Sequence, residues 1–187
     1  MFRTAFIIIS VILLGGFLLG VTAVWLAHAG SHTLGPGGEY ASGLIGLLGR
    51  LHPLSVHFPV ALIFAAGLAE IFYMRRGNNA FGFAARFALL TAAACAVVSV
   101  LLGFAAAAGR ASLTDSAIQI GFHGTMGLAT AGLVSLTAAL AVSASHKRDP
   151  FRVRLYRTAL AVTMIVVGFA AHTGAMLVFG PNYFSIF

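Results

Sequence analysis

The amino-acid sequence predicts an all-α integral membrane protein, built as a bundle of five transmembrane helices. Two observations lead to this fold class. Of the 187 residues, 60% are hydrophobic and only 8% are charged, whereas soluble domains carry roughly 25% charged residues. In addition, apolar runs of the roughly 20 residues needed to cross a bilayer recur along the chain. So few charges cannot cover a water-facing surface, and lipid is the solvent that suits this composition.

The first apolar run, at about residues 5–27, predicts an N-terminal helix that stays attached to the chain. A signal peptide is the alternative, because Ala27-His28-Ala29 resembles a cleavage site. The run, however, exceeds the roughly 7–15 residues of a signal h-region. A glycine-rich loop follows, broken by Gly35-Pro36-Gly37-Gly38. We therefore expect an N-terminal helix at residues 1–29, a loop at residues 30–50 and a four-helix domain at residues 51–187, with no evident internal sequence repeat.

Four further apolar runs predict the helices of this domain. They lie between Pro53 and Arg75, from about Phe83 to Ala108, from about Ile118 to Ala144, and from about Leu155 to Val178. Pro53 suits a first helical turn, where its missing N–H is not needed. Asp149-Pro150 is expected to break the chain within a basic loop at residues 145–157. A short apolar stretch at residues 44–48 predicts an interfacial turn or helix.

Lysine and arginine residues predict the orientation in the membrane. One side carries nine of them, Arg3, Arg75, Arg76, Arg86, Lys147, Arg148, Arg152, Arg154 and Arg157, and the other side carries only Arg50 and Arg110. Cytoplasmic loops are enriched in Lys and Arg, so we expect the N-terminus in the cytoplasm, and the C-terminus and the loop at residues 30–50 in the periplasm. This topology and the surrounding membrane lipid account for the net charge of +7, without a nucleic-acid partner.

Six of the seven histidines fall on the predicted periplasmic side, namely His28, His32, His52, His57, His123 and His172, and only His146 is cytoplasmic. From the rise of 1.5 Å per residue, His57 and His123 lie roughly 6 Å inside their helix starts, and His172 roughly 10 Å inside its helix end. Polar side chains at such a depth usually face the bundle interior. His52 is shallower and lies about 140° around a helix from His57, so these two need not face the same partner.

A shared layer of imidazoles favours a haem b site. Haem takes axial imidazoles from opposite sides, commonly from facing helices. His57 with His123 or His172 are the preferred ligands, and His52 is the next candidate. Small residues could make room for the ring, at Gly121, Gly124, Gly127 and Gly174, and Arg50 and Arg110 could pair with the propionates. Copper is the second candidate. Zinc is disfavoured because no HExxH motif occurs and the single cysteine, Cys95, lies within an apolar run.

The remaining polar residues do not indicate an enzyme that acts alone, since the sequence shows neither a nucleophile–base pair nor a carboxylate dyad. Glu70 lies near the predicted cytoplasmic end of its helix and is expected to pair with Arg75 or Arg76, or to handle protons. Two alternatives to electron transfer stay open. One is a cofactor-free accessory subunit of a membrane complex, and the other is a transporter or metal-handling protein.

The segment Leu51-His52-Pro53-Leu54-Ser55-Val56-His57-Phe58-Pro59 resembles the opening of the DUF2231 family of bacterial membrane proteins. The likeness continues through Leu102-Gly103, residues 123–127 and residues 171–180, and covers roughly residues 50–182. It implies a four-helix module that often accompanies c-type cytochrome or quinoprotein dehydrogenase domains, hence electron transfer with haem b.

Carried over to this chain, the family pattern gives His52, His57, His123 and His172 as candidate ligands. Phe179 stands where some relatives have a further histidine, so a second haem that depends on that position is not implied. The implied partners are other subunits of a respiratory or dehydrogenase complex, a periplasmic cytochrome c and quinone.

Overall fold

The computed structural model describes residues 44–108, 114–146 and 149–180. Two short helices, α2 (Leu44–Arg50) and α3 (His52–Ser55), precede four long ones, α4 (His57–Arg76), α5 (Asn79–Ala108), α6 (Thr114–His146) and α7 (Pro150–Phe179). No strand occurs in these ranges, and the predicted all-α class is confirmed there. The first predicted helix, at residues 5–27, lies outside the described residues.

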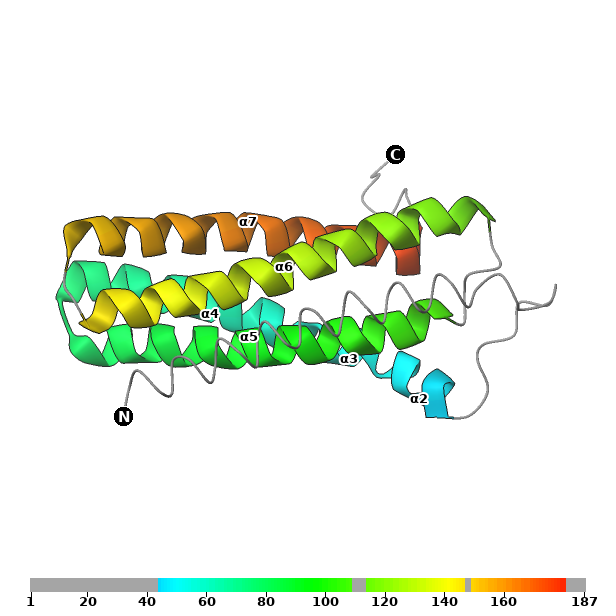
Figure 1. Cartoon of the computed structure of the whole chain (residues 1–187), viewed down its shortest axis with the longest axis horizontal. Coiled ribbons are helices and arrows are strands. Elements are labelled where there is room, and N and C mark those ends of the chain that lie inside the picture. Colours follow the sequence, from blue (N-terminus) through cyan, green and yellow to red (C-terminus); the bar gives the residue numbers. More distant parts are fainter. Residues whose placement is uncertain (1–43, 109–113, 147–148, 181–187) are drawn as a thin grey trace.

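The four long helices run side by side with alternating direction (Figure 1). Helix α4 packs against α5 and α6 against α7, while α5 also contacts α6 and α4 contacts α7. This is the up-down-up-down arrangement of a four-helix bundle. One end carries His52 and His123 and is called the histidine end. The other end carries Arg75, Arg76 and the link between α6 and α7, and is called the basic end.

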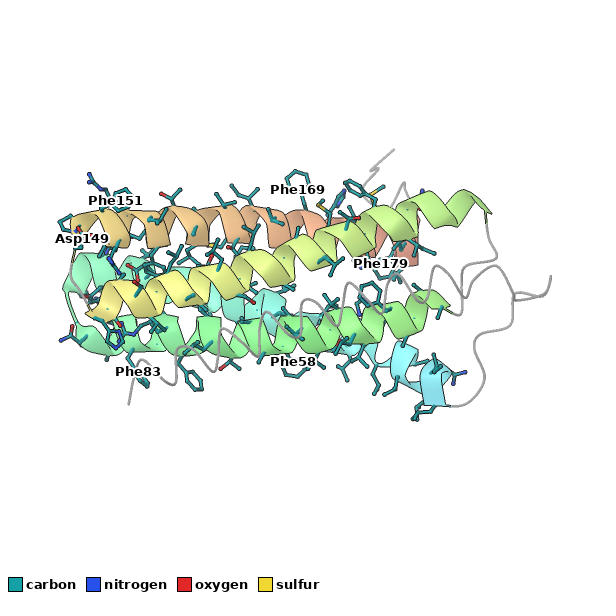
Figure 2. All side chains as sticks on the ribbon, viewed as in Figure 1. Phe58, Phe83, Asp149, Phe151, Phe169 and Phe179 are labelled. Atoms are coloured by element: carbon teal, nitrogen blue, oxygen red, sulfur yellow. The ribbon has the colours of Figure 1, made fainter. Side chains whose placement is uncertain are left out.

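Four apolar segments are each long enough to cross a membrane, namely Leu44–Arg76, Asn79–Ala108, Gln119–His146 and Pro150–Phe179. Large apolar side chains project outward from the bundle, as Phe83, Phe151 and Phe169 show in Figure 2. Phe58, Phe83, Phe151, Phe169 and Phe179 are each 58–67% exposed. An outer surface of this kind is unfavourable in water and favourable in lipid. The chain is therefore an all-α membrane protein with at least these four candidate spans.

Small residues dominate the interior of the bundle. Among the most deeply buried residues, Ala66, Ala92 and Ala93 belong to the same core cluster as the larger Ile63 and Leu89. Small side chains let helix backbones approach closely, and in lipid this packing, more than the hydrophobic effect, holds helices together. Small residues thus form the centre of the bundle.

A hydrogen bond between two buried threonines crosses this core from α6 to α7. Thr163 Oγ1 donates to the Ala159 carbonyl at 2.7 Å and lies 2.8 Å from Thr137 Oγ1, so Thr137 is the donor of the pair. Replacing Thr163 with valine keeps the shape of the side chain and removes the acceptor. We expect Thr163→Val to lower the unfolding free energy in bicelles by about 1 kcal/mol.

A double-mutant cycle with Thr137→Val checks this expectation, because removing both partners should cost little more than removing one. Fully additive losses would contradict a direct interaction between the two hydroxyls. Thr91→Val is the matched control, since among the described residues the Thr91 hydroxyl bonds only to the Phe87 carbonyl of its own helix.

The connection between α6 and α7 is tighter than the sequence analysis expected. The predicted basic loop at residues 145–157 is wrong, because α6 continues to His146 and α7 begins at Pro150. Asp149 is a helix cap, and its Oδ1 accepts from the Phe151 N–H at 3.1 Å. Proline fits the first helical position directly after such a cap. The arginines at positions 152, 154 and 157 consequently lie on the first turns of α7.

Proline also explains why α3 and α4 are separate elements. Pro59 has no N–H to donate to the Ser55 carbonyl one turn earlier, which interrupts the helix around Val56. His52 therefore lies on its own short helix at the mouth of the bundle. At the opposite end of α4, Gly77 adopts a φ of +66° and its N–H bonds to the Tyr73 carbonyl at 2.9 Å, which closes the helix.

Candidate functional site

His52 lies half-buried between α3 and α5 at the histidine end. Its Nδ1 is 2.9 Å from the carbonyl oxygen of Ser99 on α5. A carbonyl oxygen can only accept, so Nδ1 carries the proton and Nε2 keeps its lone pair. The ring also rests on the backbone of α5, because a Cβ placed on Gly103 would lie 2.9 Å from the His52 Cε1. His52 is thus held in one tautomer with its coordinating nitrogen available.

His123 has an equivalent setting between α6 and α7. Its ring is half-buried, and Nδ1 lies 3.1 Å from the Thr173 hydroxyl. That hydroxyl donates its own hydrogen to the Ala170 carbonyl at 3.0 Å and therefore accepts from His123. A Cβ on Gly174 would lie 2.9 Å from the His123 Cε1. His123 consequently has the same tautomer as His52, with an unprotonated Nε2.

These two imidazoles meet inside the bundle, although they come from elements that are not neighbours in the sequence. The ring centroids of His52 and His123 lie 6.1 Å apart with an angle of 71° between the planes. Two imidazoles on opposite sides of one metal, each with its nitrogen about 2 Å from the ion, have ring centroids about 6 Å apart. The separation of the pair is therefore compatible with a shared metal centre.

The other predicted ligands lie elsewhere. His57 is exposed, and its Nδ1 is 2.6 Å from the Pro53 carbonyl one turn earlier on the chain. His172 is also exposed on α7. In the described parts of the chain, no three His, Cys, Asp or Glu side chains gather closely enough to hold a metal ion. The ligand role predicted for His57 and His172 stays a prediction, and the contacts favour His52 with His123.

Of the two arginines proposed for haem propionates, Arg50 is exposed at the end of α2, at the histidine end. Arg110 lies outside the described residues. The backbone of Ala106 on α5 packs closely against α2, because a Cβ on Gly49 would lie 2.8 Å from the Ala106 Cα. Helix α2 is thereby fixed beside the mouth of the histidine pair.

Glu70 forms a second polar cluster, toward the basic end. Glu70 is 4% exposed, and its carboxylate accepts two hydrogen bonds, from Tyr156 Oη at 3.0 Å and from Arg157 Nε at 2.8 Å. The expected partners were Arg75 or Arg76, but both are exposed on the last turn of α4. The observed ion pair instead ties α4 to α7. Nothing in the spacing along the chain indicated these partners, which lie 86 and 87 residues away.

Comparison with known proteins agrees with this description. The family model of predicted membrane proteins known as DUF2231 matches residues 50–182, which include the histidine pair and all four long helices. No curated protein and no solved structure matches the chain. The family match covers most of the sequence, and it confirms the resemblance drawn from the HP…VHFP segment. The chain belongs to the DUF2231 family of predicted membrane proteins.

Proposed function

We propose that this protein is a membrane-bound, b-type cytochrome-like electron-transfer subunit with one haem b held between His52 and His123. The observation that carries the proposal is the half-buried imidazole pair, with ring centroids 6.1 Å apart. Each Nδ1 donates to a fixed acceptor, so each Nε2 is a ready metal ligand. Such partners orient a ligating histidine and raise its basicity.

The donor set fits haem better than it fits a bare ion. A porphyrin brings four nitrogens of its own, so its iron needs only two axial ligands from the protein. A structural zinc takes four protein ligands, and no third suitable side chain joins the pair within the described residues. Copper is the second candidate, because imidazole suits that metal.

Each residue of the site has a separate role in this proposal. His52 and His123 would bind the iron, and Arg50 with Arg110 would offer cations to the propionates. The bound haem would supply one-electron chemistry, while the chain sets binding, orientation and potential.

The topology completes the proposal. Five membrane helices, with the N-terminus in the cytoplasm of a bacterium and the histidine end at the periplasmic face of the inner membrane, would follow the strong bias of Lys and Arg. Electrons would pass between a periplasmic redox partner such as a cytochrome c and the quinone pool. Other subunits of a respiratory or dehydrogenase complex would bind the exposed helix faces.

A cofactor-free accessory subunit is the second candidate, and one observation favours it. The His52 and His123 rings already contact each other edge to face, at an interplanar angle of 71°. This contact joins α3 to α6 at the mouth of the bundle. The pair could therefore stabilise the histidine end as a packing contact between two imidazoles.

Absorbance of the purified full-length chain separates the two candidates. A preparation from haem-replete cells should show reduced-minus-oxidised bands of b type, and a pyridine haemochrome assay should give about one haem per chain. Elemental analysis of the same sample tests copper. A preparation with neither haem nor copper would refute the redox proposal and leave the accessory subunit.

A further inference from the structure

The contacts of the two histidines repeat at equal spacings along the chain. His52 bonds to the carbonyl of Ser99, 47 residues later, and rests on Gly103, 51 residues later. His123 reaches the carbonyl of Ala170, again 47 residues later, through the Thr173 hydroxyl, and rests on Gly174, again 51 residues later. An offset of 71 residues thus relates the two settings.

The same offset relates the rest of the bundle. Apart from Ala131 and Ala144, each buried residue within 119–146 and 150–179 has a buried residue 71 positions before it. The pairs include Ile63 with Val134, Ala66 with Thr137, Leu89 with Leu160, Ala92 with Thr163 and Ala96 with Val167. Few of the paired positions carry the same residue type, which is why no repeat was evident from the sequence. The identical pairs include His52 with His123, Arg86 with Arg157 and Gly103 with Gly174.

Helical periodicity alone would match buried faces at several offsets, each about one turn apart. Only an offset of 71 also superposes the histidines, the glycines and the carbonyl acceptors. The hairpin of α3, α4 and α5 is therefore equivalent to the hairpin of α6 and α7. Since α4 and α6 both run from the histidine end to the basic end, the two hairpins are related by rotation about an axis along the bundle, as in parallel membrane repeats.

We propose that the four-helix unit is a two-fold repeat of one helical hairpin, with a single metal centre on the axis between His52 and His123, and with Gly103 and Gly174 as its matched positioning residues. This inference rests on the proposed function for the identity of the centre. The ligand of this centre belongs to a class that can form the same bond to an imidazole on each of two opposite sides, as haem iron does.

The glycines act through the rings that rest on them. A methyl group at Gly103 or Gly174 would meet a histidine Cε1 at 2.9 Å, closer than carbon atoms approach. Because each ring is also anchored at Nδ1, it must tilt and re-aim Nε2. Changing the positioning shell of a metal ligand typically costs 10–100-fold in metal affinity. We expect Gly103→Ala and Gly174→Ala each to weaken haem binding by about tenfold or more, and by similar factors.

Gly132→Ala is the matched control, because Gly132 also lies on α6 and a Cβ there meets nothing within 4 Å. It should bind haem like the parent protein. Haem titration of each full-length variant, with the midpoint potential and the low-spin electron paramagnetic resonance signal, measures the effect. If one glycine tolerates alanine while the other does not, the two-fold equivalence is overturned even though haem binding stands.

Nitrogen NMR of histidine-labelled protein tests the repeat without any cofactor. Gly103→Ala should shift the His52 ring signals and Gly174→Ala those of His123, by comparable amounts and with Nε2 unprotonated in both parent rings. This result with a haem-free parent protein would support the repeat and refute the haem. Unequal or absent shifts would refute the matched positioning roles, whether or not haem is bound.

Discussion

Replacing either His52 or His123 with alanine is expected to abolish haem retention in the purified protein. In the proposed site, each change would remove one of only two axial ligands, so haem content should fall by far more than the 10–100-fold expected for a supporting residue. Pyridine haemochrome analysis of equal amounts of protein measures the loss. Each lost ring is only half-buried and rests on a glycine, so both variants should keep the fold of the bundle.

Two comparisons make this prediction specific. His57→Ala and His172→Ala remove exposed rings and should keep their haem. Adding free imidazole to His52→Ala or His123→Ala should restore part of the low-spin spectrum, because the space above Gly103 or Gly174 is then open. A variant that had merely unfolded would show no such rescue. Loss of haem from His57→Ala with retention in His52→Ala would instead support the ligand choice made from the sequence.

Replacing Glu70 with alanine should produce the largest loss of stability. The carboxylate is 4% exposed and is the only acceptor that the described contacts give to Tyr156 Oη and Arg157 Nε. Without it, a phenol and a guanidinium remain in the bundle with no partner there. Breaking a buried ion pair from one side costs about 3–5 kcal/mol. Reversible unfolding in bicelles or mixed micelles should show a decrease of that order, reduced where Arg157 reaches solvent or headgroups.

Two further variants separate the contributions to this loss of stability. Tyr156→Phe removes one hydrogen bond and should cost about 1 kcal/mol. Arg76→Gln changes an exposed arginine at the same end of the bundle and should change little. If Glu70→Ala proved as stable as Arg76→Gln, the ion pair would be an incidental contact. The haem content of Glu70→Ala should stay normal, since the histidine pair lies at the opposite end of α4.

The sequence predicted the parts of the fold that depend on hydropathy. Long apolar runs determine helices α4 to α7, and most of their ends were therefore predicted to within a few residues. The chief error, at Asp149-Pro150, arose because the same dipeptide can end one helix or cap the next. Because α6 extends to His146, only a short link remains before Pro150, and Asp149 therefore caps α7.

The contacts of the candidate site residues were harder to predict, for a different physical reason. Depth along a helix follows from residue number, whereas facing depends on how helices pack. His57 was preferred because it lies deeper. His52, about 140° around the helix from His57, is nevertheless the residue that contacts α5, at Ser99 and Gly103. The Glu70 partners were missed likewise, since pairing across 87 residues has no local signature.

The closely packed centre of the bundle has a consequence for bioenergetics. Between the histidine pair and Glu70 lie the fully buried Ile63, Leu89 and Val134, and the hydroxyls of Thr137 and Thr163 are both already hydrogen-bonded. A hydrated ion entering this layer would lose its water shell without gaining a replacement, at a large cost in free energy. The described helices would thus act as an electrical insulator between the histidine end and the basic end.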